Sequence, residues 1–183
     1  MRSWGALLGL GLAVSAAACS DDAAGADAGD TAQVQADVPD QSLCAKYGGA
    51  ATVATVVQSY VVPELAGDCR ISAFFTSLSS DGLGHVVECL TTQVQELFGC
   101  RGITYAGSSD SRGAACRSMV EAHVGLQIGK ADFDALIEDV VTGLTKAGVA
   151  EADINAAAPA LLGMAGDIVE QPDVTAPTHE ICQ

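Results

Sequence analysis

MVEAHVGLQIGKADFDALIEDVVTGLTKAGV, residues 119–149, is the stretch that decides the fold of this chain. Met119, His123 and Leu126 recur at i, i+4 and i+7, which predicts one face of a short helix. A second, longer helix is predicted after Gly129-Lys130, where apolar residues keep helical spacing. Its apolar positions are Phe133, Leu136, Ile137, Val140, Val141 and Leu144. The stretch therefore predicts two consecutive helices, the first of which carries a histidine on its apolar face.

A histidine that points into an apolar core needs a partner for its ring nitrogens, because burying an unpaired polar group costs free energy. A backbone carbonyl bonded to His123 would meet that need, and spacing alone favours this ordinary structural role. A haem iron is another partner that suits a neutral imidazole in an apolar pocket. Both interpretations stay open at this point.

Helical periodicity covers almost the whole chain after Ser42. Pro63 and Gly67 are expected to end one apolar stripe, and Pro159 is expected to kink the last helix. No apolar run alternates with a period of two in the way that a strand requires. Besides the two helices above, the expected helical segments are residues 43–47, 53–61, 71–75, 83–97 and 154–168. The predicted fold class is all-α.

The first 18 residues have the order of a secretory signal peptide. Arg2 is followed by an apolar run from Trp4 to Val14 and by small residues before Cys19. A cysteine directly after small residues suggests lipidation of Cys19, although Ala16 stands where a larger aliphatic residue is usual; ordinary cleavage nearby is the alternative. The protein is expected to be exported as a bacterial-type lipoprotein, periplasmic or at the cell surface, touching a membrane only through this lipid.

Composition and charge divide the rest of the chain. Residues 19–41 are rich in Ala, Asp and Gly and are predicted to be a solvated tether. A folded domain is expected over 42–171, followed by a polar tail over 172–183. With eight Lys+Arg against 23 Asp+Glu, the formal net charge is −15, which disfavours nucleic acid and anionic lipid surfaces as partners.

Six cysteines remain besides Cys19, and an even number in an exported chain predicts disulfides. Their spacing shows neither CxxC nor a Cys/His cluster, so a zinc site is not expected. It also lacks CxxCH, so any haem would be held without thioether bonds. Six cysteines allow 15 pairings. Cys100 and Cys116 flank a Gly/Ser-rich insert and are predicted to pair, with a stabilisation of roughly 3 kcal/mol.

A series of short motifs, taken in order, resembles the truncated haemoglobins, globins built as a two-over-two helical sandwich. The motifs are Tyr47-Gly48-Gly49, Ser72-Ala73-Phe74-Phe75, Tyr105-Ala106-Gly107, Met119-Val120-Glu121-Ala122-His123, Ala131-Asp132-Phe133, Gly148-Val149 and Asp167-Ile168-Val169. The resemblance is to group 1 of the family and covers roughly residues 47–170. It implies a truncated globin fold, haem b as cofactor and His123 as the proximal iron ligand, with Phe75 and Met119 against the haem.

The residues on the distal side differ from the family pattern. Counting from Gly49, Val61 occupies the position of the family's distal tyrosine, and Tyr60 comes one residue earlier. A similar count places Leu83 and Val87 at the two distal positions of the third long helix. The chain also carries extra residues ahead of the proximal helix. The resemblance therefore implies an apolar distal pocket.

The remaining histidines are not predicted to bind iron. His85 lies about 200° around its helix from Leu83, opposite the apolar stripe, and is therefore expected to face solvent. His179 lies in the polar tail after Pro172 and has no predicted site.

The resemblance implies a haem protein that binds a diatomic gas: O2, CO or NO. An apolar distal pocket lacks donors for polarised iron-bound oxygen, so CO or NO is expected to bind more readily. No distal acid or base is available for NO or peroxide chemistry, so the protein is not expected to be an enzyme. The alternative is a haem-free, disulfide-stapled globin-like module for surface interactions. A disulfide-exchange or metal-carrying protein is supported by the cysteine count alone.

Overall fold

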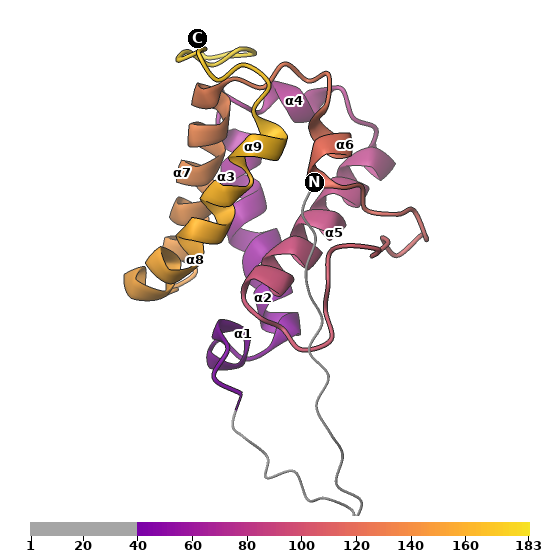
Figure 1. The fold of residues 1–183 in the computed structure, drawn as a ribbon, viewed down its shortest axis with the longest axis vertical. Coiled ribbons are helices and arrows are strands. Elements are labelled where there is room, and N and C mark those ends of the chain that lie inside the picture. The colour runs from indigo at the N-terminus through magenta and orange to yellow at the C-terminus, as the bar shows by residue number, and fades with distance from the viewer. Residues whose placement is uncertain (1–39) are drawn as a thin grey trace, which may run out of the picture. The chain divides into compact units, whose positions relative to one another are not determined.

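A computed structural model describes residues 40–183 as helices joined by turns and one long loop (Figure 1). The helices are α1 (Leu43–Lys46), α2 (Ala50–Val56), the π-helix η1 (Val57–Val61), α3 (Val62–Gly67), α4 (Ala73–Thr76), α5 (Ser80–Leu97), α6 (Met119–His123), α7 (Lys130–Lys146), α8 (Glu151–Gly163) and α9 (Ala165–Ile168). Within these residues β-structure is limited to two isolated bridges, so the all-α prediction is confirmed.

The signal peptide, most of the tether and Cys19 lie outside the described residues. In the part of the chain that the structure covers, no helix combines the length and apolar character needed to cross a bilayer.

The helical segment from Ala50 to Gly67 continues through a proline. Pro63 stands in the first turn of α3, directly after the wide π turn of η1. A proline removes one helical hydrogen bond and crowds the carbonyl four residues earlier, and a wider turn relieves that crowding. Gly67 ends the segment as the sequence predicts, whereas Pro63 does not interrupt it.

The core forms where this segment crosses two long helices. η1 and α3 pack against α7, α2 and η1 pack against α5, and α8 packs against α7. Figure 1 shows α7 next to α3. Four large side chains here are almost completely buried: Val53, Val57, Val61 and Leu144. Burying a valine or leucine contributes roughly 1.5–3 kcal/mol, so this crossing is the main apolar core of the domain.

Gly143 allows α7 to approach η1 closely. A Cβ placed on Gly143 would lie 2.6 Å from the Cα of Val61 and 2.9 Å from the carbonyl oxygen of Tyr60. Both atoms belong to the backbone, so no side-chain rotation can relieve the overlap. The core crossing therefore requires a glycine at this position.

Gly143→Ala should lower the free energy of unfolding by roughly 1–3 kcal/mol, the usual cost of overpacking a core. Gly84→Ala in α5 is the matched control, because its Cβ would meet only the Arg112 guanidinium, at 3.7 Å. The control should be neutral or stabilising by roughly 0.5–1 kcal/mol through helix propensity. Urea unfolding of both variants measures the difference. Equal stability of the two variants would show that α7 does not approach η1 so closely.

The predicted Cys100–Cys116 disulfide is wrong. Within residues 40–183 the pairs are Cys44–Cys100, Cys69–Cys182 and Cys89–Cys116. Cys100 follows the end of α5 beside α1, where the Cys44 N–H donates to the Phe98 carbonyl. The loop after α5 turns back along that helix and brings Cys116 to Cys89, with Cα atoms 5.6 Å apart. Helix docking, not distance along the chain, decides the pairing.

The C-terminal segment 172–183 is attached to the domain. Cys182 is bonded to Cys69, and the Thr178 N–H donates to Asp132 Oδ1 over 2.9 Å. The preceding helix, α8, continues through Pro159 to Gly163, and the break with α9 comes at Met164; the kink at Pro159 stays a prediction.

Candidate functional site

His123 is the last residue of α6, a helix with a complete capping box at Ser118 and Glu121. Its Nδ1 lies 2.7 Å from the carbonyl oxygen of Met119. A carbonyl can only accept, so Nδ1 carries a proton, and in the neutral ring Nε2 is then the nitrogen with the lone pair. Among residues 40–183 no hydrogen-bond partner is found for Nε2. The ring is half-buried and has the tautomer that a metal-bound histidine needs.

A tight turn follows His123. α6 ends at His123, so Leu126 does not extend its helical face as the sequence predicts. Gln127 has a φ of +58°, a left-handed conformation that is uncommon without glycine. The backbone of Ile128 then accepts hydrogen bonds from Glu170 and Gln171, at 2.9 and 3.0 Å. The turn is therefore held against the segment after α9.

Apolar side chains around His123 are exposed. Val120, Val124 and Leu126 have 51, 67 and 41% of their surface accessible. On α5, the predicted distal residue Leu83 is 42% exposed and Val87 is half-buried. Three exposed apolar residues thus lie close in sequence to His123, and Leu83 is exposed on α5.

The other predicted contacts lie in different parts of the core. Val61 is fully buried in the main core, and Phe75 packs against that cluster. Met119 packs instead against a second cluster formed by Ile128, Phe133 and Ile168. The structure therefore does not bring these predicted contacts together in one pocket, and their role in binding remains a prediction.

His85 is only partly exposed, with 27% of its side chain accessible, because it pairs with a buried carboxylate that the sequence did not predict. Its Nδ1 lies 2.9 Å from Oδ2 of Asp110, a carboxylate whose side chain is fully buried. Asp110 also accepts hydrogen bonds from Arg112 and from the Ala114 N–H. The His85 contact, followed by these donors, holds the pKa of Asp110 well below its usual range. The loop after α5 covers the face of α5 that lies opposite its apolar stripe. His85 lies on that face and holds the loop through Asp110.

Gln93 joins the two helices that carry the candidate site. Its Nε2 lies 3.0 Å from the Met119 sulfur of α6 and 3.1 Å from the Met164 sulfur. α5 and α6 are next to each other in Figure 1. Sequence reasoning missed Gln93 and Asp110, since polar residues in loops and on mixed helix faces carry no periodic signal. It also missed Met164, which lies at the break between α8 and α9. The Ser118-x-x-Glu121 capping signature was readable but was not used.

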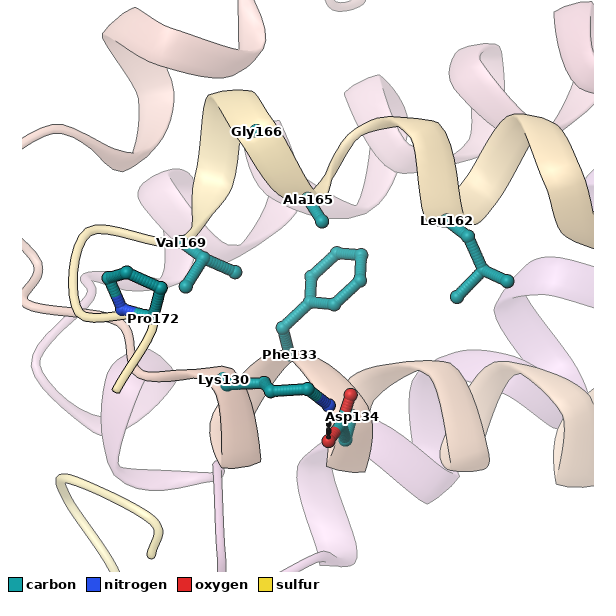
Figure 2. A pocket seen from close by; sticks show the side chains of 8 residues that line it. All are labelled: Lys130, Phe133, Asp134, Leu162, Ala165, Gly166, Val169 and Pro172. Atoms are coloured by element: carbon teal, nitrogen blue, oxygen red, sulfur yellow. Dashed lines mark hydrogen bonds and ion pairs between the residues drawn. The ribbon is translucent and has the colours of Figure 1, made fainter. Parts of the chain in front are cut away.

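Two open apolar hollows lie near α6 to α9. The first, of about 520 Å³, lies between α7 and α9, and Figure 2 shows the Phe133 ring pointing from α7 toward Ala165. Lys130 and Asp134 pair at its edge, with 2.5 Å between Nζ and Oδ2. The second, of about 480 Å³, is lined by residues that include Gln93, Met119 and Met164. Neither is lined by His123.

Comparison with known proteins identifies the fold. No family model matches the chain. A group 1 truncated hemoglobin of Tetrahymena pyriformis is 30% identical over 118 residues, which cover 64% of this chain and 86% of the relative. The crystal structure of truncated hemoglobin from that organism, in its Fe(III) form, is 26% identical, with a TM-score of 0.57 over 70% of this chain and 98% of that one. THB1 of Chlamydomonas reinhardtii shares the fold at 18% identity and a TM-score of 0.53, covering 72% of this chain and 98% of THB1.

The helix arrangement is that of a globin with a two-over-two sandwich. Because the Tetrahymena relative is matched over most of its length, the chain belongs to the truncated haemoglobin family. The resemblance predicted from the sequence is confirmed. The homology implies a haem cofactor.

The chemistry of the residues around His123 fits a haem, while the described residues gather the predicted contacts in no single pocket. The donor set needs one neutral imidazole with a free nitrogen, and His123 offers Nε2 while Met119 holds Nδ1. A haem also presents a broad apolar ring. The exposed side chains of Val124, Leu126 and Leu83 are apolar as well.

Proposed function

We propose that this protein is a b-type haem protein that binds a diatomic gas at iron ligated by His123. The observation that carries the proposal is the match to a truncated hemoglobin, and the 2.7 Å hydrogen bond between His123 Nδ1 and the Met119 carbonyl is compatible with it. Histidines that bind metals usually donate their other ring N–H to such a carbonyl, which fixes the tautomer and orients the ring. Membership of the truncated haemoglobin family supports the same assignment.

The haem would supply the iron that binds O2, CO or NO. The chain would hold it from the proximal side through His123 Nε2. Glu121 and Ser118 cap α6, and this capping orients the helix that carries the histidine. Met119, Phe75, Val61, Leu83 and Val87 are the side chains proposed to contact the ring or its bound gas.

The proposed distal side favours ligands that need no hydrogen bond. Leu83 and Val87 have no donor, and Val61 is apolar and fully buried. Bound oxygen carries partial negative charge that a distal donor would stabilise, whereas CO carries little. Tyr60 is the nearest source of a donor in sequence, and it is 40% exposed. We therefore expect CO and NO to be held better than O2.

The absorption spectrum of the ferrous protein reconstituted with haem, with and without CO, tests this proposal. A haem-protein spectrum that CO changes supports gas binding, and its absence with haem in excess rejects it. Oxygen dissociation rates then test the distal side. Tyr60→Phe should leave the rate nearly unchanged, while Leu83→Gln, which adds a donor, should slow it. A large increase on Tyr60→Phe would show that Tyr60 reaches the bound gas.

The second candidate is a haem-free surface module stapled by disulfides. Three disulfides within residues 40–183 link α1, α5 and the C-terminal segment to the domain, which favours a scaffold held by covalent bonds. The carbonyl bond at His123 Nδ1 would also satisfy the histidine of such a module, so that bond does not separate the two functions. The spectrum described above separates the two functions.

We also propose that the protein is exported and anchored by a lipid on Cys19. The order of Arg2, an apolar run and small residues before Cys19 supports this. Fatty-acid labelling that persists in Cys19→Ser would reject it.

A further inference from the structure

We infer that Glu170 is a positioning residue for His123: its carboxylate holds the turn that follows the histidine and so orients the proximal imidazole. The part of this inference that concerns a bound haem rests on the proposed function. Glu170 lies 47 residues after His123 in the chain, so its role is visible only in the folded domain.

The carboxylate of Glu170 accepts two backbone N–H groups of the turn. The N–H of Gly125 donates to Oε1 over 2.8 Å, and the N–H of Gln127 donates to Oε2 over 2.5 Å. Successive backbone N–H groups in a left-handed turn form a concave site suited to an anion. Gly125 and Gln127 both have positive φ, at +84° and +58°. A positive φ at Gln127 costs free energy, and the hydrogen bond to the carboxylate offsets that cost.

The charge of Glu170 is maintained by these contacts. The bonds from Gly125 and Gln127, in that order, hold the pKa of Glu170 below its usual value. The carboxylate is therefore ionised at neutral pH, next to the turn that begins directly after His123. Hydrogen bonds to an ionised acceptor are stronger than those between neutral groups.

Glu170 is itself fixed by the structure. Its own N–H donates to the Ile128 carbonyl over 2.9 Å, and Gly129 and Gln171 form a parallel bridge. Just before it, Ile168 of α9 is buried with Ile128 and Phe133. The end of α9 and the turn after His123 therefore form one unit, which the carboxylate closes.

These contacts secure His123 from both sides. On the N-terminal side, the Met119 carbonyl holds Nδ1. On the C-terminal side, the turn from Val124 to Gln127 sets the direction in which the chain leaves the histidine. Loss of the carboxylate should release the second restraint and thereby weaken the first, so the ring would adopt more than one orientation and the bond of Nδ1 to the Met119 carbonyl would be made only part of the time.

Nitrogen-15 NMR of the haem-free protein tests this inference directly. In Glu170→Ala, amide exchange at Gly125 and Gln127 should speed up by about tenfold, because each loses a charge-assisted bond. The His123 ring-nitrogen shifts should move away from those of the pure Nδ1–H tautomer. Asp167→Asn is the matched control, an exposed carboxylate on α9 for which no hydrogen bond to the turn is found among residues 40–183; it should change neither signal. Unchanged amides or unchanged ring shifts in Glu170→Ala would overturn the inference.

The haem-bound protein gives a second readout that a purely structural role would not move. Glu170→Gln retains an acceptor oxygen but loses the charge near His123. Its Fe(III)/Fe(II) midpoint potential should be more positive than that of the unmodified protein and of Asp167→Asn. An unchanged midpoint potential in Glu170→Gln would mean that Glu170 only stabilises the turn. It would overturn the inference that its charge acts on the haem-bound histidine. Failure of the unmodified protein to bind haem would reject the proposed function, while the haem-free NMR result would still decide whether Glu170 orients His123.

Discussion

His123→Ala is expected to abolish the haem-protein spectrum while the helix content stays close to that of the unmodified chain. The haem affinity should fall by at least about a hundredfold, since even loss of an outer partner of a metal ligand costs 10–100-fold. The helices should persist because their cores depend on residues such as Val57 and Leu144, which lie in a different cluster. Haem titration and far-ultraviolet circular dichroism measure the two effects.

The matched control for this variant is His85→Ala. His85 is bonded to Asp110 on the loop side of α5, so its removal should weaken that loop without removing the iron ligand. Adding free imidazole to His123→Ala should restore part of the spectrum if the substitution has only removed the ligand. If His123→Ala binds haem with an unchanged spectrum and His85→Ala does not, the proximal assignment is wrong.

Loss of the Cys69–Cys182 disulfide is expected to have the largest effect on stability. In the oxidised protein, the double change of Cys69 and Cys182 to serine should lower the free energy of unfolding by roughly 5 kcal/mol on the chain-entropy model. The reason is the length of the closed loop, a separation of 113 residues. Single domains have only about 5–15 kcal/mol of stability, so the variant should be marginal.

The contacts near this disulfide should weaken with it. Thr178 donates to both carboxylate oxygens of Asp132, which is 2% exposed, and the Ile181 N–H donates to the Cys69 carbonyl. A released C-terminal segment would expose Asp132 at the start of α7. Urea unfolding monitored by circular dichroism measures the loss of stability.

The serine variant of Cys89 and Cys116 is the control for loop length. Its separation of 27 residues predicts a smaller loss, about 3.5 kcal/mol on the same model. Non-reducing peptide mapping should first confirm both pairs. A loss below about 1 kcal/mol for the Cys69 and Cys182 variant would mean that the C-terminal segment contributes little to the fold.

The helical framework and His123 could be predicted from the sequence because they have local causes. The apolar stripe over residues 83–97 became α5 (Ser80–Leu97), and the stripe from Phe133 to Leu144 became α7 (Lys130–Lys146). A side chain repeated every three or four residues must share a helix face, whatever the rest of the chain does. The ordered motifs around His123 also sufficed to indicate the family, which the Tetrahymena relative confirms.

The orientation of the predicted distal residues could not be derived from the sequence. A residue-by-residue count from Gly49 assumes a regular helix, but the helix widens into a π turn over Val57–Val61. In that turn Val61 is fully buried against Gly143, and its neighbour Tyr60 is exposed. Which of the two approaches a bound gas depends on helix packing rather than on spacing.

The sequence by itself determined the all-α class, the helix positions, the family and the histidine proposed to hold iron. Only the tertiary structure decided the disulfide pairs, the docking of His85 on Asp110, the close approach at Gly143 and the clamp of Glu170 on the turn after His123. The physical reason is the range of the interactions. Helix periodicity and capping act within one or two turns of chain, whereas these contacts join residues that only the packing of helices brings together.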